Sequence, residues 1–328
     1  MTKKKIGLVG FFGWGNFGDE LFLEAHKQFL GDLGDIAQIN DLTKRPYFSR
    51  PLEQIIDECD AFVIGGGDLV IPWTVSDLYW NPAYLQKPVF VVGVGVPTWG
   101  GEKESVIKHY RNFLRSPSVK LIVARDKESM NWINKRIEPA VPAVFHPDLV
   151  CAMRLPRGDK QQRTLGIVLR QRNSQDDFSH VRSLCERAKS LEFKIKHIVL
   201  GTLATGAADL EVAKSFAEDG EEIIHSESLE ELCRAISSCK MLASMKFHGT
   251  VVAAMYGVPS LVMSPTDKSR HFMKILERQE LLCSFAKPNL ADRMPRFPAA
   301  IPSHSRSYLK KAAQKGYEKL RLAISSGT

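Results

Sequence analysis

The sequence lacks the features that mark secreted, membrane-spanning and zinc-knuckle proteins. Its six cysteines are scattered and form no Cys-x-x-Cys pair, so neither a metal knuckle nor a disulfide framework is indicated. No apolar stretch approaches the length of a membrane span. The lysine-rich start, with its short apolar run broken by glycines, predicts no secretory leader. We therefore expect reduced thiols and a cytoplasmic location.

Charge of either sign is weakly concentrated along the chain. Lysine and arginine total 45 against 37 aspartates and glutamates, a formal net charge of +8. Aromatic residues do not alternate with the basic ones in the manner that stacks bases, so we expect no nucleic-acid partner. The clearest basic concentrations are residues 3–5 and the tail over 310–321. Such a tail is compatible with peripheral contact at the inner face of a membrane.

Short apolar runs alternate with segments of helical spacing. Residues 61–64 and 89–94 have the length and continuous hydrophobicity of strands in a buried parallel sheet. Strands that alternate with helices predict parallel sheets covered on both faces. At 328 residues the chain is long enough for two domains. We expect an α/β protein with two Rossmann-like domains whose parallel sheets face a central cleft.

The apolar pattern lapses around Pro156 and Gly158 and then restarts, which marks a linker. The predicted divisions are an N-terminal domain over residues 1–152, a linker over 153–163, a C-terminal domain over 164–287 and a final segment over 288–328. That final segment is proline-rich and then helical, and we expect its helix to cross back onto the first domain. Other predicted helices cover residues 126–136 and 210–218.

Two glycine-rich turns each lie between an apolar run and a helix-like segment, over residues 10–20 and 245–259. A strand that feeds a glycine turn and a helix start can bind an anion, because unpaired amides and the helix dipole point at the ligand. Residues 13–18 also match G-x-G-x-x-G, with Asp41 near the place of a ribose-binding acid in a nicotinamide oxidoreductase. Against that interpretation, Asp19 and Glu20 would put two carboxylates where the pyrophosphate must sit.

Six motifs, in order along most of the chain, together resemble the polysaccharide pyruvyl transferase family. They are residues 15–20, 65–67, 93–95, 124–129, 147–148 and 248–259. The resemblance implies a GT-B-like fold with the acceptor on the N-terminal domain and the donor on the C-terminal domain. It implies transfer of pyruvate from phosphoenolpyruvate to a sugar of a surface polysaccharide or its precursor, as a ketal, with release of phosphate. Phosphoenolpyruvate is then a donor substrate, no cofactor or metal is required, and the glycan acceptor is lipid-linked or free. The oligomeric state stays open.

Ketal formation needs an acid for the methylene carbon of phosphoenolpyruvate and cations for its carboxylate and phosphate. His248 is the expected acid, because imidazole titrates near neutral pH and the resemblance points to the same residue. The resemblance adds that Asp19 orients or deprotonates an acceptor hydroxyl. Lys246 and one of Arg170 and Arg172, at the end of a strand, are the expected anion ligands. The other expected substrate contacts are Gly15, Asn16, Gly18, Gly67 and Gly249.

Each of these residues also has a structural interpretation. Helix capping would account for Asn16 and Asp19, and solvated surface charge would account for Lys246 or the arginines. Two positions depart from the family's pattern, with Lys246 where arginine is usual and Asp68 where glycine is common. Lysine cannot form the paired, parallel hydrogen bonds that an arginine guanidinium makes with a carboxylate or phosphate. A sugar-nucleotide-dependent GT-B glycosyltransferase acting on a surface glycan therefore remains the alternative, and a scaffold that binds glycan without catalysis is another.

Overall fold

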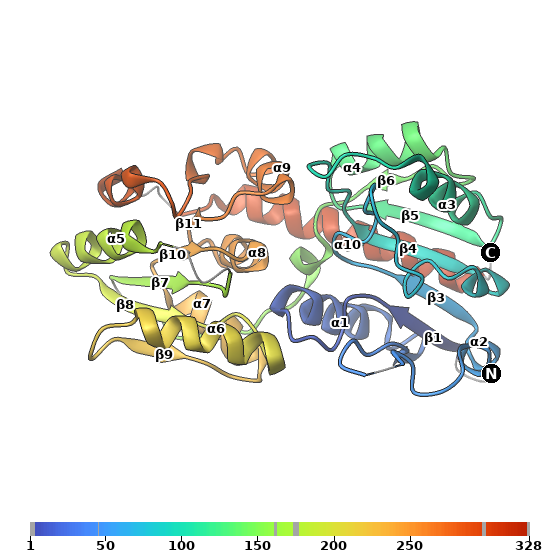
Figure 1. Cartoon of the computed structure of the whole chain (residues 1–328), viewed down its shortest axis with the longest axis horizontal. Coiled ribbons are helices and arrows are strands. Elements are labelled where there is room, and N and C mark those ends of the chain that lie inside the picture. The colour runs from blue at the N-terminus through green and yellow to red at the C-terminus, as the bar shows by residue number, and fades with distance from the viewer. Residues whose placement is uncertain (1–3, 45, 161–162, 173–176, 297–299, 327–328) are drawn as a thin grey trace. The chain divides into compact units, whose positions relative to one another are not determined.

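The chain folds into two units, each built on an open parallel sheet with helices (Figure 1). The computed structural model describes residues 4–44, 46–160, 163–172, 177–296 and 300–326. The first unit comprises the chain up to Trp14, residues Asp19–Met153 and the chain from Leu309 onward. The second comprises Gly15–Gly18 and Arg154–Tyr308. The predicted α/β class with two parallel-sheet domains is confirmed.

The first unit contains a six-stranded sheet in the order β2-β1-β3-β4-β5-β6, with every neighbouring pair parallel. The strands are β1 (Lys4–Val9), β2 (Gly34–Gln38), β3 (Ala61–Ile64), β4 (Val89–Val94), β5 (Val119–Ala124) and β6 (Val144–Phe145). All residues of β3 and β4 are buried. Strands with both faces covered read as continuous apolar runs, which is why both were predicted with these bounds.

Helices alternate with the strands of the first unit, and one helical segment changes type part-way along. They are α1 (Phe17–Leu30), α2 (Leu52–Glu58), α3 (Glu104–Leu114) and α4 (Lys127–Trp132), with 3-10 helices at Pro82–Gln86 and Leu149–Ala152. The helix predicted over residues 126–136 is α4 followed by a π-helical turn, Ile133–Ile137. It begins where the Asp126 side chain accepts the Ser129 amide at 2.7 Å.

The second unit contains a five-stranded parallel sheet in the order β11-β10-β7-β8-β9. Its strands are β7 (Thr164–Val168), β8 (Lys194–Ile198), β9 (Glu222–Ile224), β10 (Met241–Ser244) and β11 (Ser260–Val262). Its helices are α5 (Ser179–Ser190), α6 (Leu203–Phe216), α7 (Leu229–Ser238), α8 (Phe247–Tyr256) and α9 (Asp267–Ile275), with 3-10 helices at Gln279–Leu281 and Pro288–Arg296. Helix α6 begins at Leu203, whereas the predicted helix begins at residue 210. The first turns of α6 hold small residues without apolar spacing, so the sequence pattern did not reveal them.

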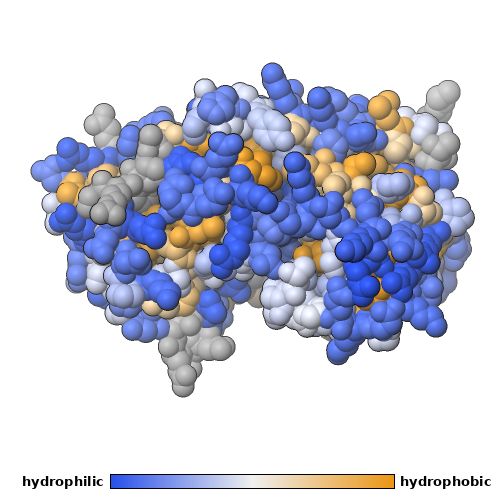
Figure 2. Space-filling view, turned by 90° about the horizontal axis from the view of Figure 1, so that it is seen from above, coloured by the Kyte–Doolittle hydropathy of each residue, from blue (hydrophilic) through white to orange (hydrophobic). Residues whose placement is uncertain are grey.

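Hydrophilic residues cover most of the face shown in Figure 2, and apolar residues emerge there in separate small patches. The exposed large hydrophobic side chains are Trp14, Trp99, Leu203, Tyr308 and Leu322. All six cysteines are free thiols. Within the described residues, each helix is too short or too polar to cross a membrane.

The last helix, α10 (Ser303–Ser325), belongs from Leu309 onward to the first unit, where it packs against α1. The Phe29 and Tyr317 rings stack at 4.3 Å between centroids. The Arg321 guanidinium donates to the Phe29 carbonyl at 2.6 Å. The Tyr317 hydroxyl lies 3.2 Å from Nδ1 of His26, a fully buried residue. This interface therefore places a titratable ring inside the core.

Burial lowers the pKa of His26 to about 4, although a backbone hydrogen bond at Gly65 opposes the shift. The folded protein keeps this ring neutral while the unfolded chain protonates it below about pH 6.5. The contribution of His26 to the free energy of unfolding is therefore fully present above that pH. It falls by roughly 3 kcal/mol as the pH drops toward 4.

We predict that His26→Gln removes most of this acid sensitivity, because glutamine carries no titratable proton. Chemical denaturation between pH 7 and pH 4 should show the wild type losing roughly 3 kcal/mol more than the variant. His304→Gln, at an exposed histidine, is the matched control and should follow the wild type. Parallel curves for wild type and His26→Gln would contradict the prediction.

Candidate functional site

His248, the predicted acid, is the second residue of α8 and is 8% exposed. Its ring lies against the backbone of Gly18, since a Cβ at Gly18 would come within 1.8 Å of His248 Nδ1. The Phe247 ring packs edge-on beside it, with centroids 4.9 Å apart. The imidazole is therefore held with its Nδ1 edge toward Gly18.

The first glycine turn takes part in the second unit through residues 15–18. Asn16 forms an antiparallel bridge with Gly201, and the Thr202 amide donates to the Gly15 carbonyl at 2.8 Å. Gly15 has a φ of +80°, and a Cβ there would lie 1.9 Å from the Thr202 oxygen. Only glycine suits this backbone conformation and this approach. The structure thus brings Gly15, Asn16 and Gly18 together with His248.

Gly249 follows His248 and lets the first turn of α8 approach neighbouring strand ends. A Cβ there would lie 2.6 Å from Ser244 Oγ and 2.7 Å from Leu200 Cδ1. Ser244 ends β10, and Leu200 follows β8. The position of His248 is consequently defined by the carboxyl edge of the sheet, where ligands bind in open α/β folds.

Lys246 is not a solvated surface lysine. It precedes α8 as its N-cap residue, and its side chain is 10% exposed. Its Nζ lies 2.5 Å from Asp209 Oδ2 and donates to the Leu200 carbonyl at 2.6 Å. The ammonium group therefore faces a buried carboxylate of α6.

Arg170 and Arg172 both follow β7 and are exposed. The guanidinium of Arg172 lies over the Phe285 ring, 5.3 Å from its centroid, and its Nη1 is 3.5 Å from Ser264 Oγ. The Gln171 amide between the two arginines donates to Asp209 Oδ1 at 2.7 Å. The loop backbone is thereby fixed while the arginine side chains remain accessible.

Asp209 is the residue that sequence reasoning missed in this site. It is 4% exposed and contacts both Lys246 and the loop after β7. The sequence offered no signal for it, because a lone acid just before the helix predicted over residues 210–218 looks like an ordinary surface residue.

The first unit gathers carboxylates at the carboxyl ends of its strands. Asp19, 8% exposed, lies in the first turn of α1, and a Cβ at Gly67 would come within 3.1 Å of Asp19 Oδ1. Asp68 forms an ion pair with the buried guanidinium of Arg125. Burial opposes the charge of Arg125, but the carboxylates of Asp68, Asp148, Asp126 and Asp19 outweigh it and raise its pKa. Asp19 and Gly67 thus lie together in a polar cluster.

The dinucleotide interpretation fits the first glycine turn poorly. The Gly13 amide donates to Glu20 Oε1 at 2.8 Å, so a carboxylate already occupies this amide. Asp41 accepts both the Thr43 amide at 2.9 Å and its hydroxyl at 2.6 Å. Two acidic side chains therefore border the place where a pyrophosphate would need positive charge.

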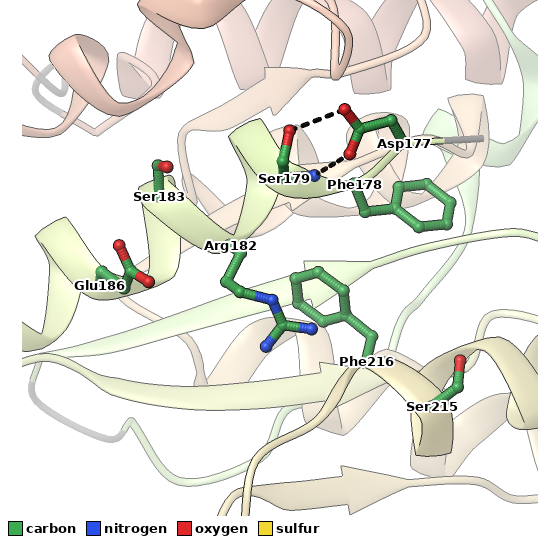
Figure 3. A pocket seen from close by; sticks show the side chains of 8 residues that line it. All are labelled: Asp177, Phe178, Ser179, Arg182, Ser183, Glu186, Ser215 and Phe216. Atoms are coloured by element: carbon green, nitrogen blue, oxygen red, sulfur yellow. Dashed lines mark hydrogen bonds between the residues drawn. The ribbon is translucent and has the colours of Figure 1, made fainter. Parts of the chain in front are cut away.

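A hollow of about 510 Å³ in the second unit lies away from the predicted residues (Figure 3). It is lined by Asp177, Phe178, Ser179, Arg182, Ser183, Glu186, Ser215 and Phe216. Its polar groups are engaged locally, since Ser179 donates twice to Asp177 and the Arg182 guanidinium stacks over Phe216, 4.8 Å from the ring centroid. We assign it no role in the site.

Two solved structures of UDP-N-acetylglucosamine 2-epimerases share the two-unit architecture of this chain. UDP-N-acetylglucosamine 2-epimerase from Rickettsia bellii matches with a TM-score of 0.63 at 12% identity, covering 99% of this chain and 97% of its own. UDP-GlcNAc 2-epimerase from Neisseria meningitidis, bound to UDP-GlcNAc, matches with a TM-score of 0.61 at 14% identity, covering 97% and 99%. At this identity the likeness defines the fold alone. A search of curated proteins gives no match.

The fold thus defines a two-unit α/β protein of the GT-B class. The model of the polysaccharide pyruvyl transferase family matches residues 16–267, which is most of the chain and includes His248. The protein belongs to the polysaccharide pyruvyl transferase family and is a transferase of polysaccharide biosynthesis.

We predict that Gly18→Ala displaces the His248 ring, because the added methyl would occupy the place of Nδ1. The histidine-ring signals in an NMR spectrum should show the His248 signal shifted, and overpacking should lower the unfolding free energy by about 1–3 kcal/mol. Gly101→Ala is the control, since a Cβ there meets nothing within 4 Å and its φ of +77° costs only backbone strain. An unmoved His248 signal in Gly18→Ala would show that the ring does not depend on this glycine.

Proposed function

We propose that the protein transfers pyruvate from phosphoenolpyruvate to a sugar of a surface polysaccharide, such as an exopolysaccharide, or of its precursor. The product is a cyclic ketal, and phosphate is released. The observation that carries the proposal is the setting of His248, inside the family match, at the start of α8 and against Gly18. A family of transferases that forms ketals needs an acid held in this manner.

His248 acts as the general acid through Nε2, because its Nδ1 edge lies against Gly18. Protonation of the methylene carbon of phosphoenolpyruvate develops positive charge on the carbon that carries the phosphate oxygen. A sugar hydroxyl attacks that carbon and loses its proton, which restores the acid. The carbon–oxygen bond to phosphate then breaks, and a second hydroxyl closes the ketal ring as its proton passes to the departing phosphate. Proton transfer of this kind contributes about 10²–10⁴-fold to rate.

Arg170 and Lys246 are the proposed ligands of the anionic donor, and Arg172 is the second arginine within the same loop. A guanidinium can bind a carboxylate or phosphate through two parallel hydrogen bonds. We place Arg170 first in this role, because the guanidinium of Arg172 already lies over the Phe285 ring. Gly15, Asn16, Gly18 and Gly249 shape the backbone around His248, where we expect the reacting carbon.

The acceptor hydroxyl is assigned to Asp19 in the first unit, with Gly67 giving the sugar access to that carboxylate. Asp19 is an acceptor of hydrogen bonds and can orient or deprotonate a hydroxyl. We include in the proposal a cytoplasmic location and a glycan that is lipid-linked or free. The basic residues that would face an anionic membrane surface are Lys310, Lys311, Lys315 and Lys319.

We predict saturable binding of phosphoenolpyruvate in a calorimetric titration, with nucleotide sugars and NADH titrated in parallel. Arg170→Ala should weaken binding roughly 10- to 100-fold, because a charge-assisted contact is lost. Arg187→Ala, at an exposed arginine of α5, is the matched control and should bind as the wild type does. Binding of a nucleotide sugar in place of phosphoenolpyruvate would identify the protein as a glycosyltransferase instead.

A second prediction concerns chemistry rather than affinity. His248→Gln should lower phosphate release from phosphoenolpyruvate, measured with a pool of candidate glycan acceptors, by about 10²-fold or more. The dissociation constant of the His248→Gln variant for phosphoenolpyruvate should stay within about threefold of the wild-type value. The reason is that the acid interacts with the methylene carbon in the transition state rather than in the bound ground state. Equal turnover by variant and wild type would remove His248 from the mechanism and favour a non-catalytic scaffold.

A further inference from the structure

We propose that Asp209 is a positioning residue of the donor site, and that one buried carboxylate sets both Lys246 and the loop that carries Arg170. The inference rests on the proposed function, since it concerns how that site is held together. Asp209 lies on α6, outside the sequence motifs that the chain shares with the family. Its carboxylate oxygens contact Lys246 and the Gln171 amide, so its effect on the reaction is exerted through those residues.

The first arm of Asp209 reaches the start of the histidine helix. Its Oδ2 lies 2.5 Å from Lys246 Nζ, with 4% and 10% of the two side chains exposed. The same Nζ donates to the Leu200 carbonyl at 2.6 Å. Removing one partner from so buried a pair leaves an uncompensated charge, so the pair is held in one arrangement. Because Lys246 immediately precedes α8, this arrangement sets the turn that carries His248.

The second arm reaches the arginine loop. Asp209 Oδ1 accepts the Gln171 amide at 2.7 Å, and Gln171 lies between Arg170 and Arg172. The side chains of Arg170 and Gln171 are exposed, so this backbone contact restrains the direction in which Arg170 leaves the sheet. One carboxylate thus links the segments that follow β7 and β10, and the Leu200 carbonyl adds the segment that follows β8.

The charge balance of the pair decides how the site attracts its donor. Asp209 offsets part of the positive charge of Lys246, so the exposed arginines supply most of the net positive charge offered to phosphoenolpyruvate, and Lys246 contributes the remainder. A supporting residue of this kind fixes the geometry of the groups that contact the substrate. The affinity gained from Arg170 should consequently depend on Asp209.

The test is a double-mutant cycle read by calorimetry with phosphoenolpyruvate. Arg170→Ala should cost at least about tenfold in affinity in the wild type but less than about threefold in Asp209→Asn, because Arg170 is no longer held there. Glu211→Gln is the matched background, since Glu211 lies on the same helix in an exposed ion pair with Lys214. In that background Arg170→Ala should cost what it costs in the wild type. An equal cost in all three backgrounds would overturn the proposal.

A second readout needs no substrate and separates this inference from the proposed function. The His248 ring signal, assigned by its loss in His248→Gln, should shift in Asp209→Asn and stay in place in Glu211→Gln. The double variant Asp209→Leu with Lys246→Met replaces the ion pair by apolar groups and should recover the melting midpoint lost in Asp209→Leu. It should still bind phosphoenolpyruvate more weakly than the wild type. If the wild type does not bind phosphoenolpyruvate, the proposed function fails, and the His248 signal alone then decides the role of Asp209.

Discussion

The buried ion pair of Lys246 and Asp209 is the interaction on which the second unit's site depends. In a parallel sheet each strand ends in its own loop, and backbone bonding between strands stops there. Something else must fix those loops relative to one another. Here a single carboxylate binds the ammonium group before α8 and the amide after β7. The net contribution of such a pair to stability is small, but its geometry is restrictive because breaking it strands a charge in the interior.

The second constraint is the close approach of neighbouring groups to the backbone of the first glycine turn. It explains the glycines at positions 15 and 18 better than anion binding does. Gly18 leaves room for the His248 ring, and Gly15 leaves room for the Thr202 carbonyl. The motif that looks like a nucleotide fingerprint is therefore used for packing around a histidine. In the first unit the Gly13 amide is likewise occupied by Glu20. The same glycine pattern thus serves different physical ends, and the contacts distinguish them where the spacing does not.

The sequence allowed good prediction wherever one segment carries its own signal. Strands β3 and β4 were predicted as they stand, because strands buried on both faces read as continuous apolar runs. The short elements β2 and α2 carry weaker patterns and were not predicted. Helix α3 was also missed, although its buried residues Val106, Ile107, Tyr110, Phe113 and Leu114 recur at helical spacing. Asp209 was missed for a different reason, since the partner of a buried charge is set by tertiary contact. Lys246 could be found from its motif, but its carboxylate could not.

The distribution of charge supports the assignment of donor and acceptor to different units. In the second unit, Lys246 is paired with Asp209, and the arginines after β7 are exposed. Exposed arginines suit a small, strongly anionic donor. The first unit instead surrounds the buried Arg125 with carboxylates, Asp19 among them, which suits a ligand rich in hydroxyl groups. The multiply charged phosphoenolpyruvate anion would be repelled by that acidic edge, and a neutral sugar would gain little from the arginines. This distribution of charge agrees with the proposed placement of the donor on the second unit and of the glycan on the first.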